Sequence, residues 1–236
     1  MKGDKLRLDK YGRKELAGHI IAPLLVGGLF FASAGRFDSV RAWIWVIITT
    51  LYYLGGLVVL LKANPQLLNA RGGLNKHDNT KFWDKPLLQV FAVTGLWGHT
   101  VLMGLDVGRF KWTLLDPWFI LPGIIFFILA FILVYWSMAV NIHFETTVRI
   151  QHDRNHKVIS SGPYRFLRHP GYLGLILVPF GSTMILGSMY GFITSFATFI
   201  VLGIRTWLED RTLIEELEGY KKYASQTRYR LIPYIW

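Results

Sequence analysis

Long apolar runs, each of about 17 to 24 residues and separated by more polar segments, dominate the sequence. Each run is near the roughly 20 residues that a helix needs to cross a bilayer. The chain is 52% hydrophobic and 15% aromatic, which is too apolar for an ordinary soluble domain of 236 residues. We therefore expect an all-α integral membrane protein with about six transmembrane helices. The six runs are 17–34, 42–61, 87–105, 118–140, 173–189 and 190–208.

Only a tight turn at Gly187 and Ser188 separates the last two runs. Two helices joined by so short a turn are expected to form a hairpin. A partly re-entrant segment is the alternative, and five spans is therefore the alternative count.

The basic residues are distributed unevenly along the chain and predict its orientation. Of the 26 Lys and Arg residues, 22 lie before residue 17, in 62–86, in 141–170 or from residue 205 onward. The positive-inside rule then places both termini and both long loops in the cytoplasm. We attribute the net charge of +11 to this topology, and we expect no nucleic-acid partner.

The basic start, with Lys2, Lys5 and Arg7, imitates a signal peptide, but no convincing cleavage site follows and we expect a retained first span.

Several aromatic and ionisable residues lie within or beside the predicted spans. His19 and His99 are isolated on otherwise apolar helices, where an ionisable group is a functional candidate by default. A neutral histidine bonded to a neighbouring helix is the interpretation we favour. Tryptophans near the span ends are expected to anchor the helices at the headgroup layer; these are Trp43, Trp45, Trp112, Trp118 and Trp136.

The chain contains no cysteine, which excludes a disulfide, a thiolate metal site and a thiol nucleophile. His152 and His156 are four residues apart, but no third metal ligand accompanies them, so we expect no metal site.

The segment 141–172 is dense in Arg, His and Tyr, and it contains the turn signals Gly162-Pro163 and Pro170-Gly171. We expect it to form a cytoplasmic loop that folds back on itself. Between the turns the chain supplies cations, ring faces and hydrogen-bond donors, which suit a ligand with carboxylate, purine and cationic parts. A basic loop that contacts anionic membrane lipid is an equally good interpretation from these residues alone.

A second polar cluster follows the last apolar run. Arg205 and Glu209 are four residues apart and share one helical face, where they can pair with each other or flank one ligand. An exposed salt bridge between them would contribute less than about 1 kcal/mol. The tail from Tyr220 mixes basic and aromatic residues, and we expect it to lie on the membrane surface and cover the site.

Taken together, these motifs resemble the isoprenylcysteine carboxyl methyltransferase family. The resemblance rests on the run from His156 through Ser161-Gly162-Pro163-Tyr164 to Arg168-His169-Pro170-Gly171-Tyr172, then on Arg205-x-x-x-Glu209 and on Tyr220-x-x-Tyr223. It covers residues 141–236, so we expect N-terminal transmembrane helices over 1–140 and a methyltransferase core over 141–236. Membrane phospholipid and thiol methyltransferases share the general plan.

The resemblance implies an S-adenosylmethionine-dependent methyltransferase. It would take its cofactor from the cytoplasm and a lipophilic acceptor, such as a prenylcysteine carboxylate or a phospholipid amine, from the bilayer. The implied acceptor-handling residue is Arg205. An amine or thiol acceptor would need a general base, and His169 is a candidate for it. Expected cofactor contacts are Gln151, His156, Val158, Ile159, Tyr164, His169, Pro170, Tyr172 and Glu209, to which charge complementarity adds Arg168 as a partner for a carboxylate.

Two other functions remain open from the sequence. Membrane sterol reductases also carry an Arg-His-Pro-like segment and a similar ending, so a reductase using a nicotinamide cofactor is the enzymatic alternative. This chain lacks other segments that those reductases share. A non-catalytic membrane scaffold or a transporter is the third possibility, although charges that would line a transport path are scarce in the runs.

Overall fold

The computed structural model describes residues 8–73 and 79–236, and these residues form helices and loops without a β-strand. The basic start with Lys2, Lys5 and Arg7 lies outside the described residues. The α-helices are α1 (Lys10–Ala34), α2 (Val40–Ala63), α3 (Pro65–Arg71), α4 (Asp84–Phe91), α5 (Trp97–Met103), α6 (Ile120–Val140), α7 (Pro170–Leu186), α8 (Gly191–Glu216) and α9 (Tyr220–Gln226).

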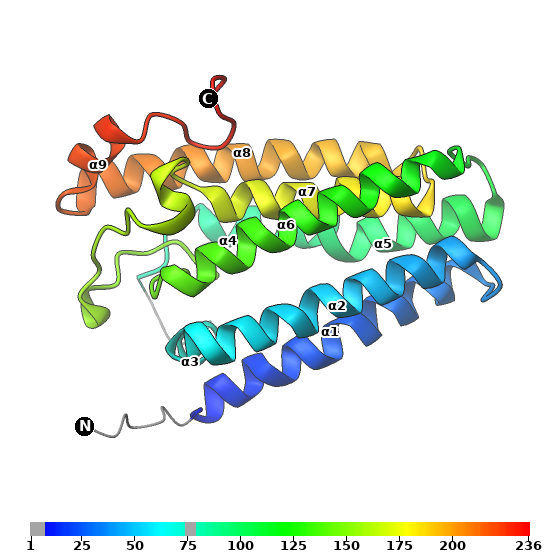
Figure 1. Ribbon diagram of the computed structural model, residues 1–236, viewed down its shortest axis with the longest axis horizontal. Helices are drawn as coiled ribbons and strands as arrows, with labels where there is room; N and C mark the ends of the chain where they lie inside the picture. The colour runs from blue at the N-terminus through cyan, green and yellow to red at the C-terminus, as the bar shows by residue number, and fades with distance from the viewer. Residues whose placement is uncertain (1–7, 74–78) are drawn as a thin grey trace.

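Long antiparallel helices make up the body of the molecule (Figure 1). Among the described residues, five helical segments are long and apolar enough to span a membrane, judged by length and composition. They are α1, α2, Asp84–Phe110, Pro117–Val140 and α8. The segment Asp84–Phe110 consists of α4 and α5 with π-helical turns after each, Ala92–Leu96 and Gly104–Phe110. The prediction of an all-α integral membrane protein is confirmed.

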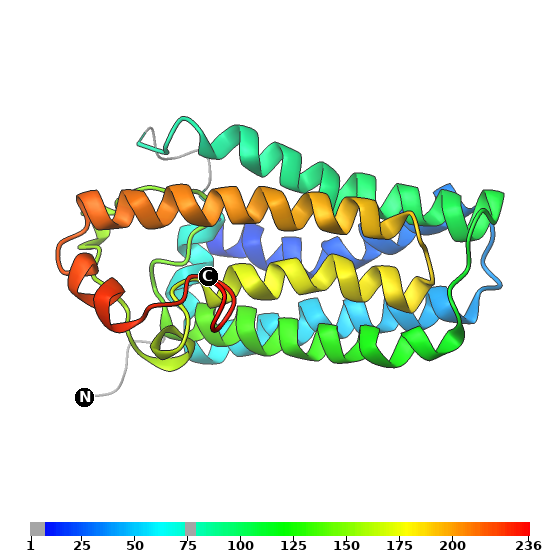
Figure 2. The ribbon, with the colours of Figure 1, turned by 90° about the horizontal axis from the view of Figure 1, so that it is seen from above.

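The apolar run 173–189 forms α7, which has 17 residues and is shorter than the other five segments. It is one continuous helix that runs alongside α6 and α8 over its whole length (Figures 1 and 2). Gly187 ends it in the left-handed conformation, with a φ of 84°, and α8 begins after Ser188–Tyr190. The predicted hairpin is therefore present, and five is the number of segments that reach spanning length.

Small residues bring α6 and α7 into close contact. A Cβ atom added at Gly123 would lie 2.9 Å from the Gly181 carbonyl oxygen, and one added at Gly181 would lie 2.9 Å from the Gly123 carbonyl oxygen. Membrane helices commonly pack through such small residues, because apolar side chains gain little by leaving lipid for another helix. This packing fixes the two helices that flank the loop 141–169.

The two ends of the bundle differ in what they carry. The α1–α2, α5–α6 and α7–α8 connections lie at one end (Figure 1). The start of α1, the short helices α3 and α9 and the loop 141–169 lie at the other (Figures 1 and 2). All the polar motifs singled out in the sequence thus gather at one end, which we call the loop end.

Side-chain exposure on the long helices agrees with a membrane setting. Large apolar side chains such as Leu24, Leu51 and Ile193 are more than 60% exposed in the isolated chain. Four of the five predicted anchoring tryptophans are also exposed. The prediction was wrong for Trp45, which is 2% exposed because its indole packs on Phe30 and donates to Ser182 Oγ at 2.9 Å.

Candidate functional site

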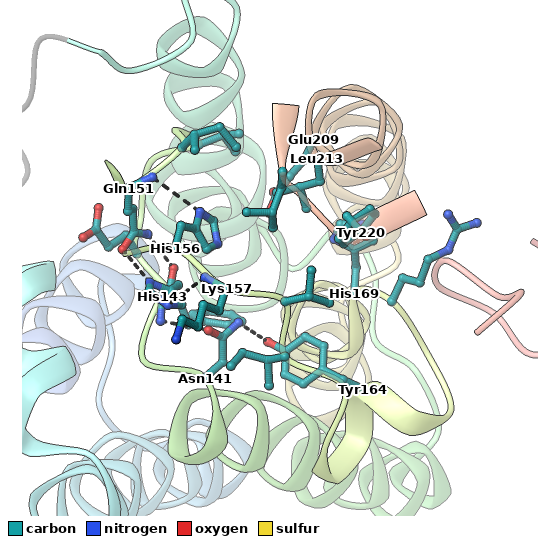
Figure 3. Close-up of a pocket in the computed structure, with 18 of the residues that line it drawn as sticks. Asn141, His143, Gln151, His156, Lys157, Tyr164, His169, Glu209, Leu213 and Tyr220 are labelled. Atoms are coloured by element: carbon teal, nitrogen blue, oxygen red, sulfur yellow. Dashed lines mark hydrogen bonds between the residues drawn. The ribbon is translucent and has the colours of Figure 1, made fainter. Parts of the chain in front are cut away.

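A cavity with an empty volume of about 830 Å³ opens at the loop end. The loop 141–169 forms one wall, and α8, the α8–α9 connection and α9 form the opposite wall (Figure 3). Nine of the ten residues predicted to contact a cofactor line it: Gln151, His156, Val158, Ile159, Tyr164, Arg168, His169, Tyr172 and Glu209.

The remaining two predicted site residues lie outside the lining. Pro170 is the first residue of α7, where a proline costs no intrahelical hydrogen bond, and it is buried. Arg205 lies on α8 one turn deeper in the bundle than Glu209, and its guanidinium packs over the Tyr172 ring at 5.1 Å from the ring centroid.

The loop wall is held in shape by hydrogen bonds among its own side chains. Gln151 is 2% exposed and donates through Nε2 to the His143 carbonyl at 2.8 Å, while its Oε1 lies 3.2 Å from His143 Nδ1. The backbone N–H of Lys157 donates to His143 Nε2, which assigns the proton of that ring to Nδ1. The amide of Gln151 therefore stabilises the conformation of the loop through His143, although Gln151 also lines the cavity.

The ring of His156 packs against that of His143, with 4.4 Å between the ring centroids and an angle of 37° between the ring planes. Its Nδ1 accepts from the Gln151 N–H at 3.4 Å, so its Nε2 carries the proton. Burial lowers the pKa of His156 to about 4 and also lowers the pKa of His143 below 6.5. Both rings are consequently neutral at physiological pH, and His156 presents a neutral N–H donor at the cavity wall.

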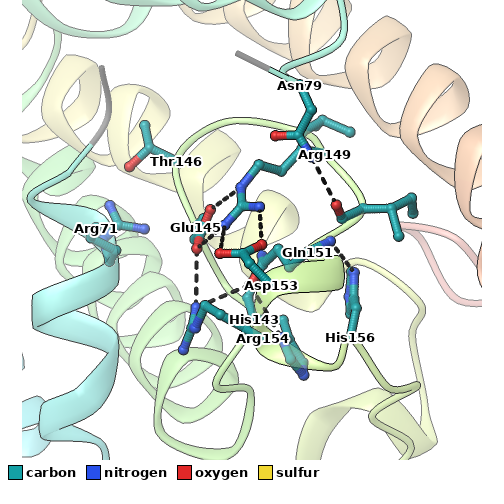
Figure 4. A network of polar contacts seen from close by, with 12 residues as sticks. Arg71, Asn79, His143, Glu145, Thr146, Arg149, Gln151, Asp153, Arg154 and His156 are labelled. Carbon is teal, nitrogen blue, oxygen red and sulfur yellow. Dashed lines mark hydrogen bonds and ion pairs between the residues drawn. The ribbon is translucent and has the colours of Figure 1, made fainter. Parts of the chain in front are cut away.

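A network of ion pairs within residues 145–154 stabilises the conformation of the loop (Figure 4). Arg149 is 3% exposed, and it pairs with Glu145 at 2.9 Å and with Asp153 at 2.6 Å. Arg154 adds bonds to Glu145 and to Gln151 Oε1, both at 3.0 Å. These pairs are local in sequence, so the polar composition of the loop is used largely to fold it.

On the opposite wall, the carboxylate of Glu209 accepts from the Tyr172 hydroxyl. It forms no ion pair with any cation in the described part of the chain. The predicted alternative of an Arg205–Glu209 salt bridge was wrong, because Arg205 pairs with Asp84 at the start of α4, at 2.7 Å. Glu209 thus presents to the cavity a negative charge that has no ion-pair partner among these residues, although it also interacts electrostatically with Arg205 one helical turn away.

Asp210 is the centre of a second buried cluster. Its side chain is 1% exposed and accepts from Arg168 Nη1 at 2.8 Å, from Arg230 Nε at 2.8 Å and from the Tyr220 hydroxyl at 2.9 Å. The Nε2 atom of His169 lies 3.3 Å away. Two guanidinium groups therefore share one carboxylate, and Arg168 Nε is buried without a hydrogen-bond partner among the described residues.

The C-terminal tail is attached directly to this cluster. The backbone N–H groups of Arg168 and His169 donate to the carbonyls of Tyr229 and Arg230, both at 2.9 Å. Tyr223 lines the cavity and donates to the Tyr164 carbonyl at 2.7 Å. The expectation of a tail that lies against the site agrees with these contacts.

Several lining residues were not singled out from the sequence. Asn141 and His143 come from the loop, and Leu213 and Leu217 come from α8 and the residue that follows it. The spacing of four residues from Glu209 to Leu213 and Leu217 was a usable signal, since such residues share one helical face. Asp84 gave no local signal, because its partner Arg205 is 121 residues away.

The fold and the cavity together describe a membrane protein with a candidate small-molecule site at one end of its helical bundle. Residues 123–215 match the isoprenylcysteine carboxyl methyltransferase (ICMT) family, so this part of the chain is similar to that family. The family is one of membrane methyltransferases. No curated protein matches the chain. The matched range begins within α6, earlier than the resemblance recognised in the sequence, and ends before α9 and the tail.

Proposed function

We propose that this protein binds S-adenosylmethionine in the cavity at the loop end and transfers its methyl group to a lipophilic acceptor. The observation that supports this proposal most is the distribution of charge around Glu209 and Asp210. An unpaired carboxylate at Glu209 suits the ammonium of the cofactor. Two guanidinium groups around the single carboxylate of Asp210 leave a positive excess that suits its carboxylate, with the unpartnered Arg168 Nε as a donor.

The other walls suit the remaining parts of that ligand. The faces of Tyr164, Tyr172 and His169 offer aromatic surface for a sulfonium or a purine. His156 adds a neutral N–H donor that does not repel a cationic ligand. When bound, S-adenosylmethionine supplies an electrophilic methyl group. The residues of the chain then have to orient two reactants in line and exclude water.

The position of Arg205 favours an acceptor that arrives from the bilayer. Its guanidinium lies one helical turn deeper in the bundle than Glu209, behind Tyr172. A lipophilic acceptor entering from the membrane would reach this level before the level of the cofactor. Asp84 and the Thr146 carbonyl fix the orientation of the guanidinium, at 2.7 and 2.6 Å, so that Arg205 can handle an acceptor such as a carboxylate. An ionised carboxylate needs no general base.

The proposal predicts a specific loss of cofactor affinity in Glu209→Gln. This substitution keeps the shape of the side chain and removes the charge proposed to bind the ammonium. We expect the dissociation constant for S-adenosylmethionine to rise about tenfold to a hundredfold, as for loss of a charge-assisted hydrogen bond. Calorimetry on the purified full chain measures it, with NADPH titrated in parallel to test the reductase alternative.

Glu215→Gln is the matched control, because Glu215 lies on the same helix and pairs with Arg211 on the exposed surface. It should leave cofactor affinity unchanged. Binding of NADPH but not of S-adenosylmethionine would overturn the proposed cofactor. Mass spectrometry of lipid extracts incubated with the protein and methyl-labelled cofactor would then identify the acceptor class.

A further inference from the structure

A second cavity, with an empty volume of about 400 Å³, lies inside the helical bundle. Residues of α1, α2, α5, α6 and α7 and of the π-helical turn Ala92–Leu96 line it, and it shares no lining residue with the first cavity. Its walls include the apolar side chains of Val26, Leu96, Phe127 and Val178.

Two buried polar atoms without a hydrogen-bond partner belong to residues that line this cavity. They are Thr49 Oγ1 and His99 Nε2. Buried polar side-chain atoms nearly always have a partner, and leaving one without a partner costs about 1–3 kcal/mol. In the described part of the chain only one other buried side-chain atom lacks a partner, Arg168 Nε, and it belongs to the lining of the first cavity. Each unsatisfied atom is therefore associated with a cavity.

The hydrogen bond at Nδ1 of His99 determines whether the other ring nitrogen, Nε2, donates or accepts a hydrogen bond. His99 Nδ1 lies 2.6 Å from Thr194 Oγ1, and Thr194 Oγ1 donates its own proton to the Gly191 carbonyl. We assign the ring proton to Nδ1, which then donates to Thr194 of α8, as expected for a neutral histidine bonded to a neighbouring helix, and this tautomer leaves Nε2 as an acceptor. The Pro179 carbonyl also interacts with the ring, but it is an acceptor too and forms no hydrogen bond of normal geometry with Nε2.

Thr49 differs from its neighbour in the same helix. Thr50 Oγ1 donates to the Val46 carbonyl at 2.7 Å, the usual way in which a threonine within a membrane helix is satisfied. Thr49 Oγ1 makes no such bond and can both donate and accept. A π-helical turn also borders the cavity, and such interruptions of an α-helix are frequent at functional sites.

We propose that this cavity binds a neutral, membrane-soluble alcohol. Its hydroxyl would donate to His99 Nε2 and accept from Thr49 Oγ1, and its hydrocarbon would pack on Leu96, Phe127 and Val178. The lining contains no Asp, Glu, Lys or Arg, so a charged ligand would lose its hydration without gaining a counter-ion. Ordered water is the competing occupant.

The test uses the purified full chain in lipid nanodiscs and a matched pair of photoreactive probes, an aliphatic alcohol bearing a diazirine and the methyl ether of the same compound. The ether keeps the hydrocarbon but cannot donate a hydrogen bond. We expect the alcohol to label residues of α2 and α5 that line the cavity, with the ether labelling about three- to tenfold less. Mass spectrometry of the peptides locates the label.

Thr49→Val removes one hydroxyl with little change of shape and should reduce labelling by the alcohol. Thr50→Val makes the same chemical change on the same helix at a residue outside the cavity. The alcohol should label this variant as strongly as it labels the unaltered chain. Equal labelling by alcohol and ether, equal labelling of the two variants, or no label in the cavity would overturn the proposal. The last result would assign the cavity to water. Should Thr49→Val fail to fold, the ratio of alcohol to ether on the unaltered chain still decides.

Discussion

His143 and His156 pack against each other within the loop 141–169, and burial lowers the pKa of each. The pKa of His156 falls from 6.5 to about 4. Between these two pH values the unfolded chain binds more protons than the folded protein, so the folded state loses stability as the pH falls through this window. Above about pH 6.5 both states are unprotonated at these rings, and the two histidines add no pH dependence.

We therefore expect the apparent melting temperature of the purified protein to fall between pH 6.5 and pH 4, and His156→Gln to reduce that slope. His152→Gln provides the control, since His152 lies on the same loop with an exposed side chain. Thermal unfolding at several pH values measures both. A slope that is the same in His156→Gln as in the unaltered protein would contradict the assignment of a buried neutral ring.

At the scale of helices and loops, the buried Asp84–Arg205 pair connects three parts of the chain. Asp84 begins α4, Arg205 belongs to α8, and both hold the loop, through the Val148 N–H at 2.8 Å and the Thr146 carbonyl at 2.6 Å. The side chain of Asp84 is 0% exposed and that of Arg205 is 5% exposed. The first half of the chain therefore contributes directly to the shape of the cavity at the loop end.

Asp84→Asn should lower both the melting temperature and the affinity for S-adenosylmethionine. Removing one partner of a buried pair costs about 3–5 kcal/mol, because the other charge stays buried, and this corresponds to a drop of roughly 6–20 °C in the melting temperature. Arg205→Lys keeps the charge but loses the planar fork, so turnover should fall more than cofactor affinity. The exposed Arg211–Glu215 pair is the comparison, and Arg211→Lys should change little. Unchanged stability in Asp84→Asn would show that the pair contributes nothing.

The degree to which the sequence predicted these elements depended on how local the signal was. The apolar runs predicted the long helices because a span of about 20 residues is specified by contiguous sequence. Gly187 and Ser188 predicted the α7–α8 hairpin, since the turn lies between two adjacent runs. Asp84, by contrast, resembles any acidic loop residue until α4 and α8 are packed together. The role of Gln151 in the loop, rather than towards the cavity, likewise depends on the folded position of His143.

For the whole molecule, the antiparallel course of successive helices brings the start of α1 and helix α9 to the same end (Figure 1). The connection between α5 and α6, which contains Asp116, lies at the opposite end. The uneven distribution of Lys and Arg predicts that the loop end faces the cytoplasm. Reporter fusions at Asp116 and at Trp236 should then report opposite sides of the membrane, with the fusion at Trp236 cytoplasmic. The same side for both fusions would contradict the bundle topology, and opposite sides with Asp116 cytoplasmic would contradict the orientation.

The junction between the tail and the loop is made by backbone groups, Arg168 N–H to the Tyr229 carbonyl and His169 N–H to the Arg230 carbonyl. Any residue other than proline can donate such bonds, and every residue can accept them. Mutations in the tail can therefore accumulate over evolutionary time without opening this junction, provided that the chain keeps its length and path. Apart from Arg230, whose guanidinium pairs with Asp210, the side chains of this segment can then differ among related proteins, and with them what the rim of the cavity admits, while the backbone junction is kept.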